Sequence, residues 1–216
     1  MKNLEHKNRV YTSFVLLLVL ILILKSNIIL AYVLLVLGPI SFIEFSNLTK
    51  KIFKKKFNLY FFNLLFIIYV SIFCMMFFLF SSFLYLKILF FIFLSGCVAS
   101  DIGGYVVGRK FKGPKLTKIS PKKTVSGAVG SLIFTSTTVL SISVLFLNEI
   151  NYKLFFISIV ISLTCQIGDI FFSYLKRNAR VKDTGNFFPG HGGVLDRIDG
   201  ILLGVPSGFI ILSFIY

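Results

Sequence analysis

The sequence has 216 residues, of which 56% are hydrophobic and 27 are Phe, and its mean hydropathy is +0.91. A soluble domain of this length does not carry so much apolar surface, so the composition indicates an integral membrane protein. The net charge of +15 does not indicate nucleic-acid binding, because the cationic loops of membrane proteins stay on the cytoplasmic side and attract anionic lipid headgroups.

Apolar runs near the ~20 residues that a bilayer requires predict about seven transmembrane helices. In chain order the runs are Val10–Leu24, Ile28–Phe45, Asn58–Phe80, Phe83–Val107, residues of about 125–147, residues of about 152–175, and Ile198–Tyr216. No small-residue cleavage site follows the first run, so we expect a retained helix and not a signal peptide. The predicted fold class is an all-α integral membrane protein, a polytopic bundle. We expect one membrane domain, with N-terminal transmembrane helices in residues 1–94 and the polar motifs in residues 95–216.

The loops between these runs differ strongly in positive charge. Residues 1–9, 50–56, 109–123 and 176–197 carry three, five, seven and five cations, which is 20 of the 23 Lys and Arg. The alternate loops hold only Lys25, Lys87 and Lys153. Positive charge is retained on the cytoplasmic side. The N-terminus and both large polar loops are therefore predicted to face the cytoplasm, as expected for a protein of the cytoplasmic (inner) membrane.

The polar stretch between the last two runs mixes carboxylates with cations. Asp196 and Asp199 lie three residues apart at the start of the last run, and Gly190-His191-Gly192-Gly193 gives the backbone freedom to wrap closely around a ligand. Its other charged residues are Lys176, Arg177, Arg180, Lys182, Asp183 and Arg197. A metal–phosphate site needs such a mixture. A solvated, charged loop is the alternative.

Two of the predicted helices each carry a carboxylate inside the membrane at the same distance from cytoplasmic cations. Asp169, Ser173, Lys176 and Arg177 share one helical face, and Asp101, Tyr105, Gly108 and Arg109 repeat that spacing. An ionisable group within a span is costly and indicates function. A structural ion pair between helices is the alternative. The small residues around Asp101 predict close helix packing.

The loop 109–123 has seven cations and no acid, and it leads into Ser120-Pro121-Lys122-Lys123-Thr124. Lys and Arg supply the countercharge that a nucleoside triphosphate and a lipid phosphate both require. A patch that binds the lipid surface is the alternative.

Together these segments resemble the two signature blocks of the phosphatidate cytidylyltransferases, or CDP-diacylglycerol synthases. Residues 173–199 read S-x2-K-R-x4-K-D-x5-P-G-H-G-G-x2-D-R-x-D, and residues 101–127, DIGGYVVGRKFKGPKLTKISPKKTVSG, are similar to the other block. The two blocks cover about a quarter of the chain. Ser126 and Ser131 depart from the family, which often has an acid or amide and a glycine at these positions.

The resemblance implies transfer of a cytidylyl group from CTP to phosphatidic acid, with Mg²⁺ as cofactor and a possible homodimer as the assembly. The metal would be held by Asp169 and Asp196, with Asp199 as a further ligand. The implied catalytic residues are Asp169, Lys176, Arg177, Lys182, Asp183, His191, Asp196 and Arg197. The implied nucleotide- and phosphate-binding residues are Asp101, Arg109, Ser120, Lys123, Thr124, Ser173, Gly192 and Gly193.

Two other functions stay open at this point. A CTP-dependent polyprenol or phytol kinase would act on a lipid alcohol and release CDP instead of pyrophosphate. A transporter or channel is the alternative that is not an enzyme, since intramembrane Asp residues also mark ion paths. The D-x-x-D-G motif at Asp196–Gly200 also occurs in CDP-alcohol phosphotransferases, but no further acid follows it here. That assignment is therefore rejected.

Overall fold

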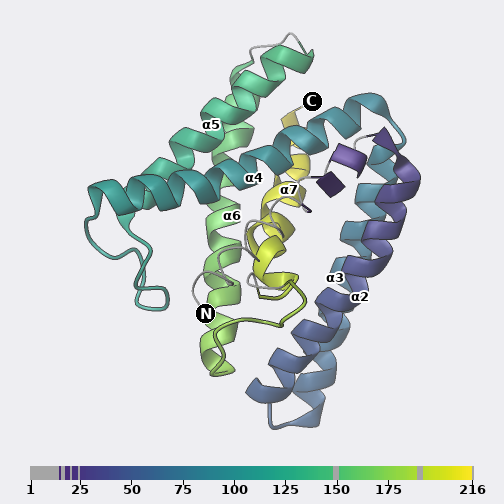
Figure 1. Cartoon of the computed structure of the whole chain (residues 1–216), viewed down its shortest axis with the longest axis vertical. Coiled ribbons are helices and arrows are strands. Elements are labelled where there is room, and N and C mark those ends of the chain that lie inside the picture. The colour runs from purple at the N-terminus through teal and green to yellow at the C-terminus, as the bar shows by residue number, and fades with distance from the viewer. Residues whose placement is uncertain are drawn as a thin grey trace. The chain divides into compact units, whose positions relative to one another are not determined.

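The structure, a computed structural model, describes residues 15, 18, 19, 21–23, 25–147, 151–188 and 192–215. Within these described residues, six long helices follow one another: α2 (Asn27–Ile52), α3 (Lys56–Ser81), α4 (Leu84–Phe111), α5 (Val125–Leu147), α6 (Tyr152–Asn178) and α7 (Leu195–Ile215) (Figure 1). All six are long and apolar enough to cross a membrane. This confirms the prediction of an all-α, multi-pass membrane protein. The first predicted span, Val10–Leu24, lies largely outside the described residues, and those described between 15 and 25 are helical.

Two helix boundaries differ from the prediction in a way that matters for the site. α2 continues past Phe45 to Ile52 and includes Lys50 and Lys51 in its last turn, where cations interact favourably with the helix dipole. α7 begins at Leu195, three residues earlier than the apolar run, because polar residues are tolerated in the first turn of a helix. Asp196 therefore lies in the first turn of α7.

The chain forms two compact units. Unit 1 comprises residues 1–82 and 175–198, and unit 2 comprises residues 83–174 and 199–216. In unit 1, α2 and α3 run side by side as a hairpin (Figure 1). The Phe45 and Phe66 rings stack with their centroids 3.8 Å apart, and Thr49 Oγ1 donates to Asn63 Oδ1 at 2.8 Å.

Unit 2 is built around the tightly packed pair of α4 and α5 (Figure 1). A Cβ on Gly103 would come within 2.6 Å of the Gly130 carbonyl oxygen, so the two backbones can approach only because both residues are glycine. Ser131 Oγ donates across the pair to Ser100 O at 2.7 Å. The predicted role of the small residues around Asp101 in close helix packing is confirmed. The predicted division into residues 1–94 and 95–216 remains a prediction about where the motifs lie.

Candidate active site

A polar pocket of about 310 Å³ opens in unit 2 where α4, α5, α6 and the loop 112–124 meet. Helix α4 contributes a carboxylate, the loop contributes two lysines and two hydroxyls, and α6 contributes an amide and a second carboxylate. Its lining residues are Ser100, Asp101, Gly104, Tyr105, Leu116, Ser120, Lys122, Lys123, Thr124, Gly127, Ala128, Ser131, Gln166 and Asp169. The structure thus brings together five of the predicted site residues: Asp101, Ser120, Lys123, Thr124 and Asp169.

The loop 112–124 is folded back on itself by its own backbone. Leu116 N donates to Lys123 O at 2.8 Å, and Val125 N donates to Pro114 O at 3.0 Å. The Thr124 hydroxyl accepts from Gly127 N at 3.1 Å, which caps the start of α5. Because Thr124 ends the loop and begins a helix, the backbone of Lys123 is held in place beside α6.

Lys123 forms an ion pair with Asp169 on α6. The two side chains are 25% and 30% exposed, so both stay accessible from the pocket. The Ser173 hydroxyl lies 3.4 Å from Asp169 Oδ1 and can support this carboxylate from the next turn. The predicted intramembrane acid therefore has a cation as its partner. Because both side chains are partly exposed in the pocket, either can exchange its partner for a phosphate or a metal ion.

Five pocket residues with polar side chains were not among the predicted site residues, namely Ser100, Tyr105, Lys122, Ser131 and Gln166. Gln166 lies three residues before Asp169 on α6, and its amide donates to Ser162 Oγ at 3.3 Å. The sequence did contain a signal for Gln166, because it is a polar amide within an apolar run and lies one turn from Asp169. Arg109, predicted to bind nucleotide, is exposed outside the pocket lining, and its guanidinium donates to the Tyr105 hydroxyl at 2.8 Å.

In unit 1, Asp196 is the centre of a second cluster. Its Oδ1 accepts from Lys176 Nζ at 2.6 Å. Its Oδ2 accepts from Thr184 N at 2.8 Å and Gly193 N at 3.0 Å, and lies 3.0 Å from the Thr184 hydroxyl. The Asp196 side chain is only 5% exposed. The three N–H donors and the Thr184 hydroxyl surround a carboxylate that offers roughly four lone-pair positions.

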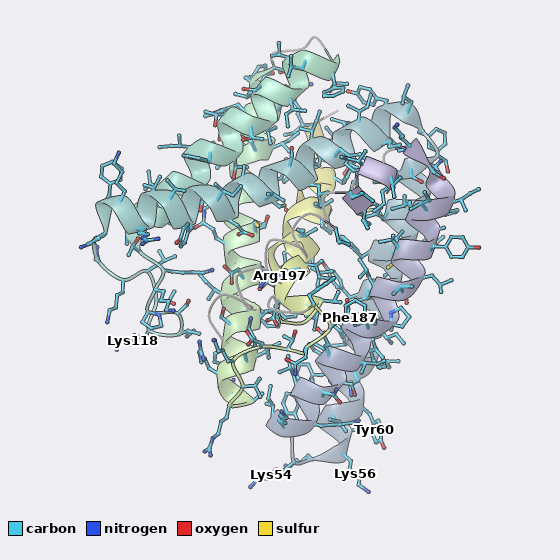
Figure 2. The ribbon with its side chains drawn as sticks, viewed as in Figure 1. Lys54, Lys56, Tyr60, Lys118, Phe187 and Arg197 are labelled. Atoms are coloured by element: carbon cyan, nitrogen blue, oxygen red, sulfur yellow. The ribbon has the colours of Figure 1, made fainter. Side chains whose placement is uncertain are left out.

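The other predicted residues of this segment that the structure describes divide into exposed charged residues and glycines that the backbone needs. Arg177, Lys182, Asp183 and Arg197 are exposed, and Figure 2 shows Arg197 and Phe187 on this segment. Gly192 has φ +82°, a backbone conformation that favours glycine. A Cβ on Gly193 would overlap the Thr184 hydroxyl. His191 lies outside the described residues.

Glu44, on α2, is a residue of this cluster in unit 1 that the sequence reasoning missed, as it missed Thr184. Its carboxylate is buried and accepts from Val194 N at 3.0 Å and from Leu195 N at 2.9 Å. It lies outside both motif blocks. An acid at the end of an apolar run was the only signal for it.

The predicted Mg²⁺ ligands differ in how well they fit a metal ion. In the part of the chain that the structure describes, no three His, Cys, Asp or Glu side chains form a ready-made metal site. Mg²⁺ often takes only one or two protein carboxylates and completes its shell with water and phosphate. Asp169, accessible in a pocket that also contains Asp101, fits this pattern. Asp196 does not fit as arranged, because Lys176 and the backbone amides of Thr184 and Gly193 already donate to its oxygens. Asp199 is not part of the pocket lining, and its Oδ1 accepts from Gly200 N at 2.9 Å.

Comparison with known proteins adds an independent result. A family model described as "Cytidylyltransferase family" matches residues 1–215. A phosphatidate cytidylyltransferase from Mycobacterium leprae is 39% identical over 121 residues, which are 56% of this chain and 38% of that protein. The same-named proteins of Rickettsia bellii and Rickettsia felis are 44% and 41% identical, over 51% and 56% of this chain and 52% and 57% of their own length. The chain thus spans between about two-fifths and three-fifths of the length of these relatives.

Proposed function

The chain belongs to the cytidylyltransferase family, and on that premise we propose that it transfers a cytidylyl group from CTP to phosphatidic acid. The products are CDP-diacylglycerol, a precursor for phospholipid biosynthesis, and pyrophosphate. The single observation that carries the proposal is the pocket of unit 2, where Lys122 and Lys123 lie with hydroxyls and two carboxylates. This is the set of groups that a metal-bound triphosphate requires.

The reaction needs charge and position more than covalent chemistry. A phosphate oxygen of the lipid attacks the α-phosphorus of CTP, the bond from this phosphorus to the β-phosphate oxygen breaks, and pyrophosphate leaves with its electron pair. Lys122 and Lys123 offset the charge on the phosphates, and Ser120 and Thr124 are available as hydroxyl donors. Arg177, Lys182 and Arg197, which are exposed in unit 1, are further cations available to bind phosphate.

Mg²⁺ is the proposed cofactor, with Asp169 as its first protein ligand and Asp101, which lines the same pocket, as a candidate for support. When bound, the ion neutralises phosphate charge and polarises the reacting phosphorus–oxygen bonds. Asp196 is proposed instead to hold the segment 183–197 in shape, because Lys176, Thr184 and Gly193 occupy its oxygens. The loss of Asp169 is therefore expected to change the Mg²⁺ requirement, and the loss of Asp196 is not.

The assay that tests the proposal uses membranes containing the protein, Mg²⁺, phosphatidic acid and CTP labelled at the α- or at the γ-phosphate. We expect the α-label in CDP-diacylglycerol and the γ-label in pyrophosphate. Transfer of the γ-label to a lipid alcohol, with release of CDP, would identify the kinase alternative. A correctly inserted protein with no affinity for CTP would favour the transporter.

Lys123→Ala is expected to raise the apparent KM for CTP about tenfold, with a smaller effect on phosphatidic acid, since it removes one charge-assisted contact in the pocket. Lys118→Ala is the matched control, because it removes the same charge from the same loop. Lys118 is exposed, is not part of the pocket lining and lies at the outer end of the loop (Figure 2). Equal effects of the two substitutions would indicate a general electrostatic patch instead.

We propose that the basic turns face the cytoplasm, supported by the 20 of 23 cations that lie on one set of loops. A cysteine introduced at Lys115 or Asn186 is expected to resist a membrane-impermeant thiol reagent added to intact cells. A cysteine at Ser82, in the exposed turn after α3, is the control and is expected to react. Strong labelling at position 115 or 186 would contradict this orientation.

A further inference from the structure

Glu44 is a buried carboxylate in a helix that is otherwise apolar on most of its length. Its residue surface is 6% exposed, and it lies on α2 between Ile43 and Phe45, outside both motif blocks. Burying a carboxylate is expensive unless it is hydrogen-bonded, and an acid in a membrane span is rarely retained without a function. The contacts of this side chain therefore need an explanation.

The first contact is with the start of α7. The residue before α7 is Val194, whose side chain cannot accept a hydrogen bond, so the helix lacks the usual Ser, Thr, Asp or Asn cap. Glu44 replaces that cap: Oε1 accepts from Val194 N at 3.0 Å, and Oε2 accepts from Leu195 N at 2.9 Å. Its negative charge also lies at the positive end of the helix dipole.

The second contact joins Glu44 to the Asp196 cluster. The Thr184 hydroxyl lies 2.8 Å from Glu44 Oε2 and 3.0 Å from Asp196 Oδ2, and Thr184 is 9% exposed. A hydroxyl has one hydrogen, so it donates to one carboxylate at a time and bridges the two. Gly185 and Gly193 leave the space that the Glu44 carboxylate fills, since a Cβ at either position would collide with it.

We propose that Glu44 is a positioning residue for the segment 183–197, which directly follows Lys182 and carries Asp196 and Arg197. It acts through Thr184 and the backbone of Val194 and Leu195, and it does not touch substrate. Without it, the segment would lose its attachment to α2 and the start of α7 would lose its cap. This inference rests on the proposed function only where the test measures turnover, because the hydrogen-exchange measurement does not require an enzymatic activity.

The test uses Glu44→Gln in the full-length protein, purified in lipid nanodiscs. The amide keeps the size of the side chain but offers one acceptor oxygen, so either Val194 N or Leu195 N loses its partner. Hydrogen exchange in peptides covering 183–197 is expected to accelerate roughly tenfold, with no change in peptides of α5. The kcat for CDP-diacylglycerol formation is expected to fall about tenfold, while the Kd for CTP changes less than twofold.

Two further variants make the test specific. Ser41→Ala, one turn earlier on α2, removes only the hydrogen bond that Ser41 donates to Leu37 O and is expected to leave both measurements unchanged. Thr184→Val removes the bridging hydroxyl and, combined with Glu44→Gln, is expected to add little to its effect, because the two residues form one network.

Unchanged hydrogen exchange in peptides covering 183–197 of Glu44→Gln would overturn the proposal. An equal acceleration of hydrogen exchange in α5 would also overturn it, because it would reveal general destabilisation. Exchange does not depend on turnover. A wild-type protein that makes no CDP-diacylglycerol would contradict the proposed function, and the exchange result would still decide the role of Glu44.

Discussion

Asp169→Asn is expected to lower the turnover of CDP-diacylglycerol formation by about a hundredfold or more, which corresponds to roughly 3 kcal/mol of transition-state stabilisation. The substitution keeps the shape of the side chain and removes the charge that pairs with Lys123 and that a hard cation prefers. The Mg²⁺ concentration required for half-maximal turnover is expected to rise in parallel. The measurement is turnover of the purified variant across a Mg²⁺ titration.

Thr164→Val is the matched control for this experiment. It is also nearly isosteric and lies on α6, where the Thr164 hydroxyl contacts Val160 O and Ser207 Oγ outside the pocket. It is expected to retain turnover within about twofold, since it removes only a modest hydrogen-bond contribution. If Asp169→Asn behaved like this control, the ion pair with Lys123 would be structural and the pocket would not be the site of chemistry.

Asp196→Asn is expected to reduce turnover by a similar factor, about a hundredfold, for a different reason. The amide replaces one acceptor oxygen with a donor, so Lys176 or the pair of backbone amides from Thr184 and Gly193 loses its partner. Breaking a buried, charged network of this kind is strongly destabilising locally. Hydrogen exchange in the segment 183–197 is expected to accelerate while the Mg²⁺ dependence stays that of the wild type.

The Mg²⁺ titration separates the two roles that Asp196 can have. A large increase in the Mg²⁺ requirement, with normal exchange in the segment, would contradict the positioning role and restore Asp196 as a metal ligand. Ser213→Ala, near the exposed end of α7, is the control for general effects on this helix, because its hydroxyl contacts only Ile210 O of the same helix.

The pattern of apolar runs was sufficient to predict the membrane class and the six described spans within a few residues, except at the end of α2. This succeeds because each backbone in a bilayer must satisfy its hydrogen bonds within its own helix, so length and hydropathy nearly determine the element. The motifs likewise placed Lys123, Thr124 and Asp169 among the candidate residues, and the structure brings them into one pocket. The family match is consistent with the same motifs.

Tertiary structure alone decided which partners these side chains have. Glu44 contacts Thr184, Val194 and Leu195, which are 140 to 151 residues away in the chain, and no periodicity in the sequence encodes such a pairing. In the sequence, Asp196 lies among acids and cations, and this mixture is what a metal–phosphate site needs. In the structure, Lys176 Nζ and the backbone amides of Thr184 and Gly193 donate to its oxygens, and the Thr184 hydroxyl lies beside them. Sequence spacing shows which side chains can share a helical face, but the packing of distant segments determines whether a carboxylate meets a ligand or a backbone amide.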